Sequence, residues 1–150
     1  MAKGPSAREF FEGLDRQAIV EAIRRAEERG FGEIRVHLQH GQVADARAEA
    51  ERTFLRLGMV RTANRTGCLL FIAPEERAFA VVGDRAIHER VGDGFWLEAR
   101  DAAAALFAEG KFTEGIVTAI ARIGAALAEH FPKAAGQTDT NELPDDVSES

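Results

Sequence analysis

The run CLLFIA at positions 68–73, six consecutive apolar residues, most strongly limits the folds open to this 150-residue chain. A strand buried on one face alternates apolar and polar residues, whereas an unbroken apolar run of this length is typical of a strand buried on both faces. Four residues, PEER, separate it from a second apolar run, AFAVVG at 78–83. Because four residues make a hairpin-length connection, we predict that the two runs pair as antiparallel strands. Helices must then cover both faces of the first strand.

The segments around this hairpin supply a third strand and the covering helices. In residues 33–38, Ile34, Val36 and Leu38 alternate with other residues, which predicts a strand with one buried face. A helical pattern between this strand and the run at 68–73 predicts a right-handed βαβ unit with parallel strands. The expected fold class is α/β, a three-layer α/β/α sandwich on a small mixed sheet with helices on both faces. The helices are expected at about 7–12, 15–29, 44–57, 85–91, 95–109 and 112–130.

Charge and apolar content divide the chain into a folded domain and two ends. The last 18 residues contain one lysine and five acidic residues but only two large apolar side chains. Such a segment buries too little surface to offset the entropy lost on ordering. We therefore predict a flexible N-terminus at 1–7, a folded domain at 8–132 and a disordered acidic tail at 133–150.

Composition argues against several classes of protein. A net charge of −6 gives no basic surface for nucleic acid, and one cysteine excludes an internal disulfide. No apolar run approaches the roughly 18 residues of a membrane span, and the polar start of the chain does not resemble a secretory signal. We expect a monomeric cytoplasmic protein without a nucleic-acid partner or a membrane span.

Standard catalytic motifs are missing from the sequence, which has no GxxxxGKS or GxxxxGKT, no GxGxxG and no GxSxG. The lone Cys68 begins the buried strand, and we interpret it as a core thiol rather than a nucleophile. His37 and His40 lie where the first strand ends, and we interpret them as solvated or capping side chains. The sequence alone does not decide whether the protein is an enzyme.

One edge of the predicted sheet gathers residues that could form a site. In a hairpin the first strand starts beside the end of the second, and the parallel strand at 33–38 begins at the same edge. The residues brought to this edge are Glu33, Arg61, Thr62, Asn64, Arg65, Thr66, Asp84 and Asp93. Their oxygens suit a hard cation such as Ca²⁺ or Mg²⁺, and carboxylates beside arginines could hold a metal and a phosphate together. The alternative is structural, with Asp84 and Asp93 capping the helices that follow them and Arg65 in an ordinary ion pair.

Four segments resemble the TPM-domain family, in its small stand-alone bacterial branch. They are GEIRVHL, LGMVRTANRTGCLLFIA, FAVVGDRAIHERVGDGFW and the final helix that closes in EHFP. The resemblance covers about residues 15–132. The family is named after a thylakoid lumen acid phosphatase, a photosystem II repair protein and a modulator of an acetylcholine receptor. It implies the same α/β/α sandwich.

The resemblance also implies the binding of Ca²⁺ or Mg²⁺ by carboxylates at one end of the sheet. It favours a cation site over capping alone, with Glu33, Thr66, Asp84 and Asp93 as the expected ligands. Since the founding members serve unrelated pathways, it further implies an accessory domain that binds a protein partner.

A second activity follows from the same resemblance, because weak acid phosphatase activity is attributed to some members of the family. In a phosphatase of this kind, Asp84 would hold the cation or act as the nucleophile, and Arg65 or Arg85 would hold the phosphate.

Overall fold

The structure is a computed structural model and describes residues 6–61, 66–133 and 147–149. Within these ranges the α-helices are α1 (Ala7–Glu12), α2 (Arg16–Arg29), α3 (Ala46–Arg56), α4 (Arg85–Ala108) and α5 (Phe112–His130). The strands are β1 (Glu33–Leu38), β2 (Gly67–Ala73), β3 (Ala78–Gly83) and β4 (Val147–Glu149). Two short 3₁₀ helices precede β2 and β3, namely η1 (Met59–Arg61) and η2 (Pro74–Glu76).

The four strands form one mixed sheet in the order β3-β2-β1-β4. Strands β1 and β2 are parallel, with Glu33 opposite Gly67. Strands β2 and β3 are antiparallel, with Cys68 opposite Gly83. The predicted βαβ unit and the predicted hairpin are both confirmed.

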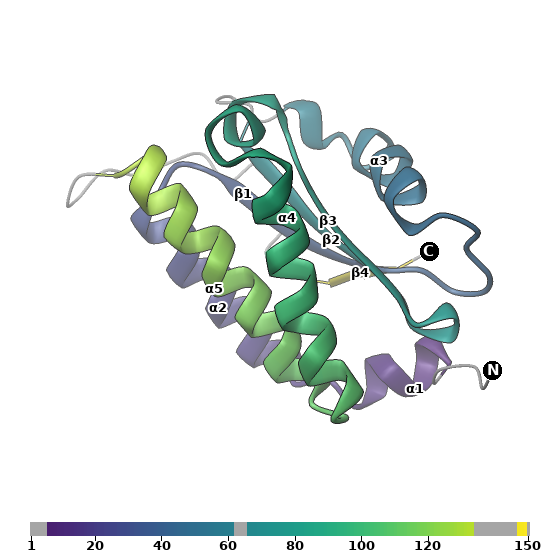
Figure 1. Cartoon of the computed structure of the whole chain (residues 1–150). Coiled ribbons are helices and arrows are strands. Elements are labelled where there is room, and N and C mark those ends of the chain that lie inside the picture. The colour runs from purple at the N-terminus through teal and green to yellow at the C-terminus, as the bar shows by residue number, and fades with distance from the viewer. Residues whose placement is uncertain (1–5, 62–65, 134–146, 150) are drawn as a thin grey trace.

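Helices cover both faces of the sheet. Helices α2, α4 and α5 lie on one face and α3 lies on the other (Figure 1). Alternate residues of β2 enter the two layers, with Cys68, Leu70 and Ile72 in the larger core and Leu69, Phe71 and Ala73 in the smaller core against α3. The α/β/α sandwich with a central strand buried on both faces is therefore confirmed.

A glycine divides α4 into the two helical pieces that the sequence predicts. Gly92 has φ 77° and ψ 175° inside an otherwise helical segment, and a positive φ favours glycine because it has no Cβ to clash. The break turns the chain so that Trp96 is buried while Leu97 stays exposed. Helix α4 as a whole packs extensively against α5 and β3.

Strand β4 lies within the segment 133–150, for which the sequence predicts disorder. Val147 pairs with Val36 and Ser148 pairs with His37, so the end of the chain adds a parallel edge strand to β1. The structure thus differs from the prediction at 147–149, while residues 134–146 and 150 lie outside the described residues. A strand of three residues is too short to show a period in the sequence, and its partners are more than 100 positions away.

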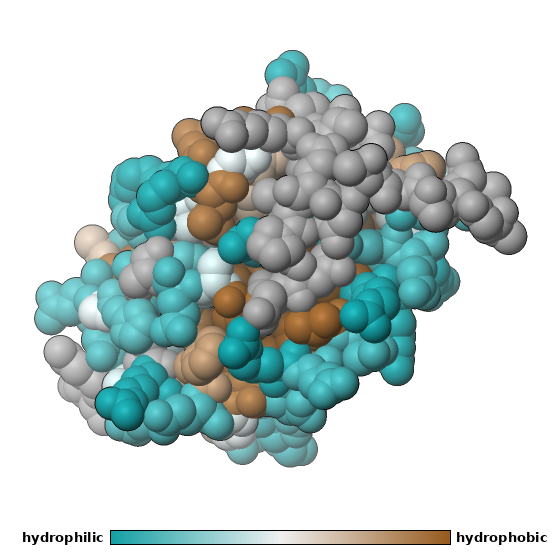
Figure 2. Space-filling model, turned by 180° about the vertical axis from the view of Figure 1, so that it is seen from behind, coloured by the Kyte–Doolittle hydropathy of each residue, from teal (hydrophilic) through white to brown (hydrophobic). Residues whose placement is uncertain are grey.

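The described residues on the back of the molecule are mostly hydrophilic (Figure 2). Seen from behind, apolar side chains gather near the middle of the face and are surrounded by hydrophilic ones (Figure 2). The large apolar side chains that stand out as exposed are Leu55 on α3 and Leu97 on α4. In the described ranges, no helix combines the length and the apolar character needed to cross a bilayer.

Candidate functional site

The start of β2 brings Glu33 and Asp84 to the same edge of the sheet. Glu33 lies opposite Gly67 in the parallel register of β1 and β2. On the other side, the Asp84 N–H donates a hydrogen bond of 2.8 Å to the Gly67 carbonyl. Gly67 on β2 therefore lies between Glu33 on β1 and Asp84 at the end of β3. The topology predicted from the sequence requires this arrangement.

Both carboxylates lie on the face of the sheet that α3 covers. Ile34 and Cys68 belong to the larger core on the opposite face, so strand alternation turns Glu33 and Gly67 toward α3. A Cβ built on Gly67 would lie 3.1 Å from the Met59 carbonyl oxygen, which confirms that this position packs against the segment after α3.

Asp84 reaches the same face because it follows Gly83 by one residue in extended backbone. A Cβ on Gly83 would lie 2.3 Å from the ring of Trp96, on the α4 side, so the next residue points the other way. Glu33 and Asp84 are each only 5% exposed, and Thr66, which precedes Gly67, is 1% exposed. Two carboxylates and a hydroxyl-bearing residue are thus buried at one strand end.

Asp84 also caps α4, as the structural interpretation of the sequence predicts. Its Oδ1 accepts a hydrogen bond of 2.7 Å from the Arg85 N–H. An ionised carboxylate offers about four lone-pair sites on two oxygens, so a capping contact does not by itself exclude a cation. Capping and cation binding by Asp84 are therefore compatible. The Arg85 side chain itself is exposed.

Asp93 lies apart from the buried pair, on the exposed surface of α4. Its side chain is 76% exposed, and its Oδ1 lies 3.6 Å from His88 Nε2 and 3.8 Å from Arg47 Nη2. The structure therefore buries Glu33 and Asp84 on one face, buries Thr66 one residue before Gly67, and leaves Asp93 outside. Within the described ranges, no three His, Cys, Asp or Glu side chains form a ready-made metal-binding group.

A cleft of about 440 Å³ borders Asp84 on the side away from Glu33. Helix α3 supplies Arg47, Glu51, Phe54 and Leu55 to its walls, and α4 supplies His88 and Trp96. The Trp96 Nε1–H donates a hydrogen bond of 2.9 Å to His88 Nδ1. Because an indole N–H can only donate, His88 carries its proton on Nε2, the atom nearer Asp93.

The remaining residues of the predicted edge cluster cannot be placed. Thr62, Asn64 and Arg65 lie outside the described residues, and so does the side chain of Arg61. Their expected roles stay predictions.

Cys68 is a core thiol, as its position in the sequence predicts. It is fully buried, and its thiol lies 3.6 Å from the Thr66 carbonyl oxygen. Burial, together with the nearby negative charge of Asp84, raises the pKa of the Cys68 thiol well above its ordinary value.

His37 is the residue whose environment the sequence interpretation gets wrong. It is fully buried rather than solvated, and it stacks on Phe71 with ring centroids 6.0 Å apart. Its Nδ1 lies 2.7 Å from Ser148 Oγ on β4. The unbroken apolar run of β2 could have indicated this burial. Since helices cover both faces of β2, they also partly cover both faces of the neighbouring strand β1, which carries His37.

Comparison with known proteins agrees with this architecture. The sequence model of the TPM domain matches residues 7–126. Among solved structures, the BA42 protein from the psychrophilic bacterium Bizionia argentinensis is 38% identical, with a TM-score of 0.80 over 90% of this chain and 92% of that chain. The N-terminal domain of the cg2496 protein from Corynebacterium glutamicum is 15% identical and shares the fold, with a TM-score of 0.60 over 85% of this chain and 80% of that one.

No curated protein matches the sequence. The match to the TPM domain nevertheless spans most of the chain, and the BA42 protein is similar over nearly the whole length of both. This chain belongs to the TPM-domain family.

Proposed function

We propose that this TPM-domain protein is an accessory domain that binds a protein partner and takes up a divalent cation, Ca²⁺ or Mg²⁺, at the buried edge of its sheet. The observation that carries the cation site is the burial of Glu33 and Asp84 on one face, on either side of Gly67. Thr66, which is buried one residue before Gly67, is the expected hydroxyl ligand.

Electrostatics supports a cation at this place. A buried carboxylate loses its hydration, which costs free energy unless another group compensates for it. The strands that carry them are second neighbours, roughly 10 Å apart at the backbone. A cation between the two side chains would reduce this cost, and Ca²⁺ and Mg²⁺ prefer carboxylate and hydroxyl oxygens. Asp93, exposed on α4, would act only through its charge.

An amide-resolved NMR titration of the metal-stripped full chain with Ca²⁺ and then Mg²⁺ tests this proposal. We expect saturable shifts at Glu33, Gly67 and Asp84 that disappear in Asp84→Asn. The matched control is Asp101→Asn, which removes the same charge from an exposed ion pair with Arg100 and should titrate like the wild type. Shifts confined to exposed acidic residues, or equal shifts in Asp84→Asn, would contradict a site at this edge.

The accessory role rests on membership in the family and needs a test of its own. We further propose that the protein is a cytoplasmic monomer. Light scattering on a sizing column checks the monomer, and fractionation of cells checks the location. Cross-linking of the wild type and Asp84→Asn, with and without Ca²⁺, shows whether capture of a partner depends on the site.

A weak metal-dependent phosphatase is the second candidate, and the cleft beside Asp84 favours it. This cleft is wide enough for a small phosphomonoester and brings Asp84 together with Arg47 and His88. Arginine suits phosphate because its planar group donates two parallel hydrogen bonds. The candidate predicts release of phosphate from p-nitrophenyl phosphate at acidic pH with Mg²⁺, and its loss in Asp84→Asn. Equal turnover by that variant would identify a contaminating enzyme.

A further inference from the structure

A second pocket lies at the opposite end of the sheet from Glu33 and Asp84. Its volume is about 320 Å³, and its walls come from η2, β3, α1, α4 and α5. It begins at Ile72, next to the last residue of β2, whereas the carboxylates flank the start of β2 at Gly67. Five residues of strand separate the two places by roughly 17 Å, so the pocket is independent of the proposed cation site.

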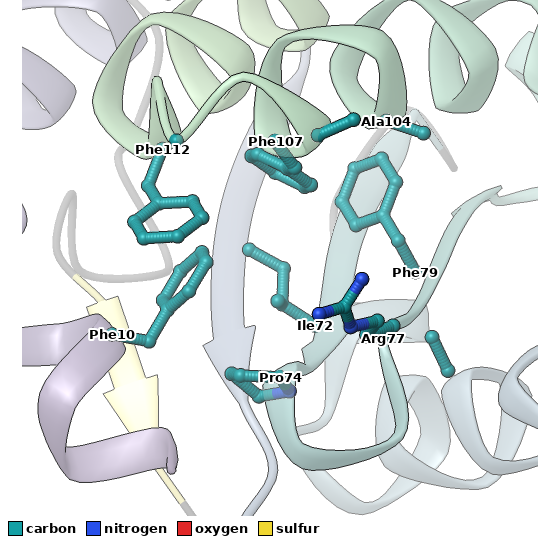
Figure 3. Close-up of a pocket in the computed structure, with 11 residues that line it drawn as sticks. Phe10, Ile72, Pro74, Arg77, Phe79, Ala104, Phe107 and Phe112 are labelled. Atoms are coloured by element: carbon teal, nitrogen blue, oxygen red, sulfur yellow. The ribbon is translucent and has the colours of Figure 1, made fainter. Parts of the chain in front are cut away.

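Four phenylalanines form the walls of this pocket. They are Phe10, Phe79, Phe107 and Phe112 (Figure 3). Phe10 packs on Phe112 with ring centroids 4.5 Å apart, and Phe79 packs edge to face on Phe107 at 5.3 Å. Because each ring is held by another ring, the walls are fixed before a ligand arrives. A preformed apolar pocket near 300 Å³ is at the lower end of the range for small-molecule sites.

Arg77 is the one charged residue among the eleven that line the pocket. Figure 3 shows its guanidinium close to Ile72 and Phe79, directed toward the aromatic rings rather than away from them. Among the described residues it makes no ion pair and no side-chain hydrogen bond. A cation at the mouth of an apolar pocket favours a ligand with an apolar body and an anionic end.

The backbone of Arg77 gives an independent reason to assign it a function. It has φ 51° and ψ 32°, and it is the one residue other than glycine with a positive φ in the described part of the chain. Its N–H donates to the Pro74 carbonyl and closes η2. Glycine or asparagine would make this turn with less strain. Strained conformations of this kind cluster at binding sites, and this one places an exposed cationic side chain at the mouth of the pocket.

We propose that this pocket binds a small amphiphilic carboxylate, such as a medium-chain fatty acid, with its chain among the four phenylalanines and its carboxylate on Arg77. The volume holds about ten groups of the size of a water molecule, which matches a chain of about eight to ten carbons.

Titration of the ¹⁵N-labelled full chain with octanoate, below the concentration at which it forms micelles, tests the proposal. Saturable shifts are expected at Phe10, Phe79 and Phe112 and not at Glu33 or Asp84. 1-Octanol has the same chain without the charge and should bind at least tenfold more weakly. Equal binding of octanoate and octanol, or shifts that do not saturate, would overturn the proposal.

Two variants separate the charge from the pocket. Arg77→Asn tolerates the left-handed backbone and should lower the affinity for octanoate to that for octanol, with the melting temperature retained. Ala104→Leu places a larger side chain at the exposed rim and should weaken both ligands, whereas Ala105→Leu, exposed on the same helix outside the pocket, should weaken neither. Unchanged binding of octanoate by Arg77→Asn and Ala104→Leu would place the ligand elsewhere.

Discussion

The buried histidine on β1 makes the stability of the protein sensitive to acid. His37 Nδ1 lies 2.7 Å from Ser148 Oγ, and that hydroxyl lies 3.3 Å from the Val36 carbonyl, to which it donates. His37 Nδ1–H then donates to Ser148, and Nε2 keeps its lone pair. Nε2 is buried and has no hydrogen-bond partner among the described residues. A proton on Nε2 would therefore place a buried positive charge in the sheet.

Burial lowers the pKa of His37 from its ordinary value of 6.5 to about 4 in the folded protein, and the positive charges of Arg56 and Arg35 add to this effect. Gln39 and Glu149 oppose the shift only in part. As the pH falls below 6.5, the unfolded chain takes up the proton first, so acid favours unfolding. Stability is fully present above pH 6.5 and is lost as the pH falls toward 4. Between pH 7 and pH 5 the loss from this group is about 2 kcal/mol.

Urea denaturation followed by circular dichroism at pH 7 and pH 5 measures this loss. From pH 7 to pH 5, the free energy of unfolding should fall by about 2 kcal/mol more in the wild type than in His37→Gln. The other titrating groups are common to both proteins, so their effect cancels. Ile123→Val is the matched control, since it destabilises a buried site on α5 without removing a titrating group. It should show the pH dependence of the wild type.

Two results would refute this reasoning about His37. One is a difference below about 0.5 kcal/mol between the pH dependences of the wild type and His37→Gln, where linkage requires about 2 kcal/mol. The other is an NMR titration in which the His37 ring takes up its proton near pH 6.5 in the folded protein, which would mean that the ring is hydrated.

Three further predictions concern packing, and a fourth concerns the burial of His37. Ile120→Ala, at a fully buried site on α5, should lower the free energy of unfolding by about 2–5 kcal/mol, and a urea titration that finds less than about 0.5 kcal/mol would show that the helix faces another way. Gly30→Ala would place a Cβ 2.5 Å from the main chain of Leu127 and should cost about 1–3 kcal/mol. Gly94→Ala, in α4 with open space around it, should instead raise the melting temperature, with a gain of about 0.5–1 kcal/mol. Deletion of 147–150 should raise the pKa of His37 toward its ordinary value, since β4 helps to bury it; an unchanged NMR titration would contradict this.

The parts of the fold that the sequence predicts are those set by local periodicity. The continuous apolar run of β2 requires cover on both faces, the four-residue connection requires a hairpin, and the glycine at 92 marks the break in α4. The edge that gathers Glu33 and Asp84 follows from these elements, because register is fixed once the strands and their directions are known. These features can be predicted without knowing any contact between side chains.

The parts that the sequence does not predict depend on contacts between distant segments. Strand β4 has no period of its own and is defined by its pairing with β1. His37 contacts that strand through Ser148 and contacts β2 through Phe71, so alternation within β1 alone suggests the wrong environment. The aromatic pocket draws its phenylalanines from four separate elements, and each of them alone looks like an ordinary core residue. The position of Asp93 outside the buried pair is also hard to predict from the sequence, because the break at Gly92 sets the direction of the chain there.

One end of the sheet carries two buried carboxylates, and the other end carries an apolar pocket with an arginine at its mouth. Helix α4 connects the two ends. Asp84 caps the start of this helix, and Phe107 near its end lines the aromatic pocket. Sites roughly 17 Å apart that share no side chain act independently unless an element between them has two arrangements. Asp84→Asn should therefore leave the octanoate titration unchanged, and Arg77→Asn should leave the Ca²⁺ titration unchanged. If either substitution alters the other titration, the two sites are coupled, and the break at Gly92 is where α4 would change shape, because glycine alone tolerates its backbone angles without strain.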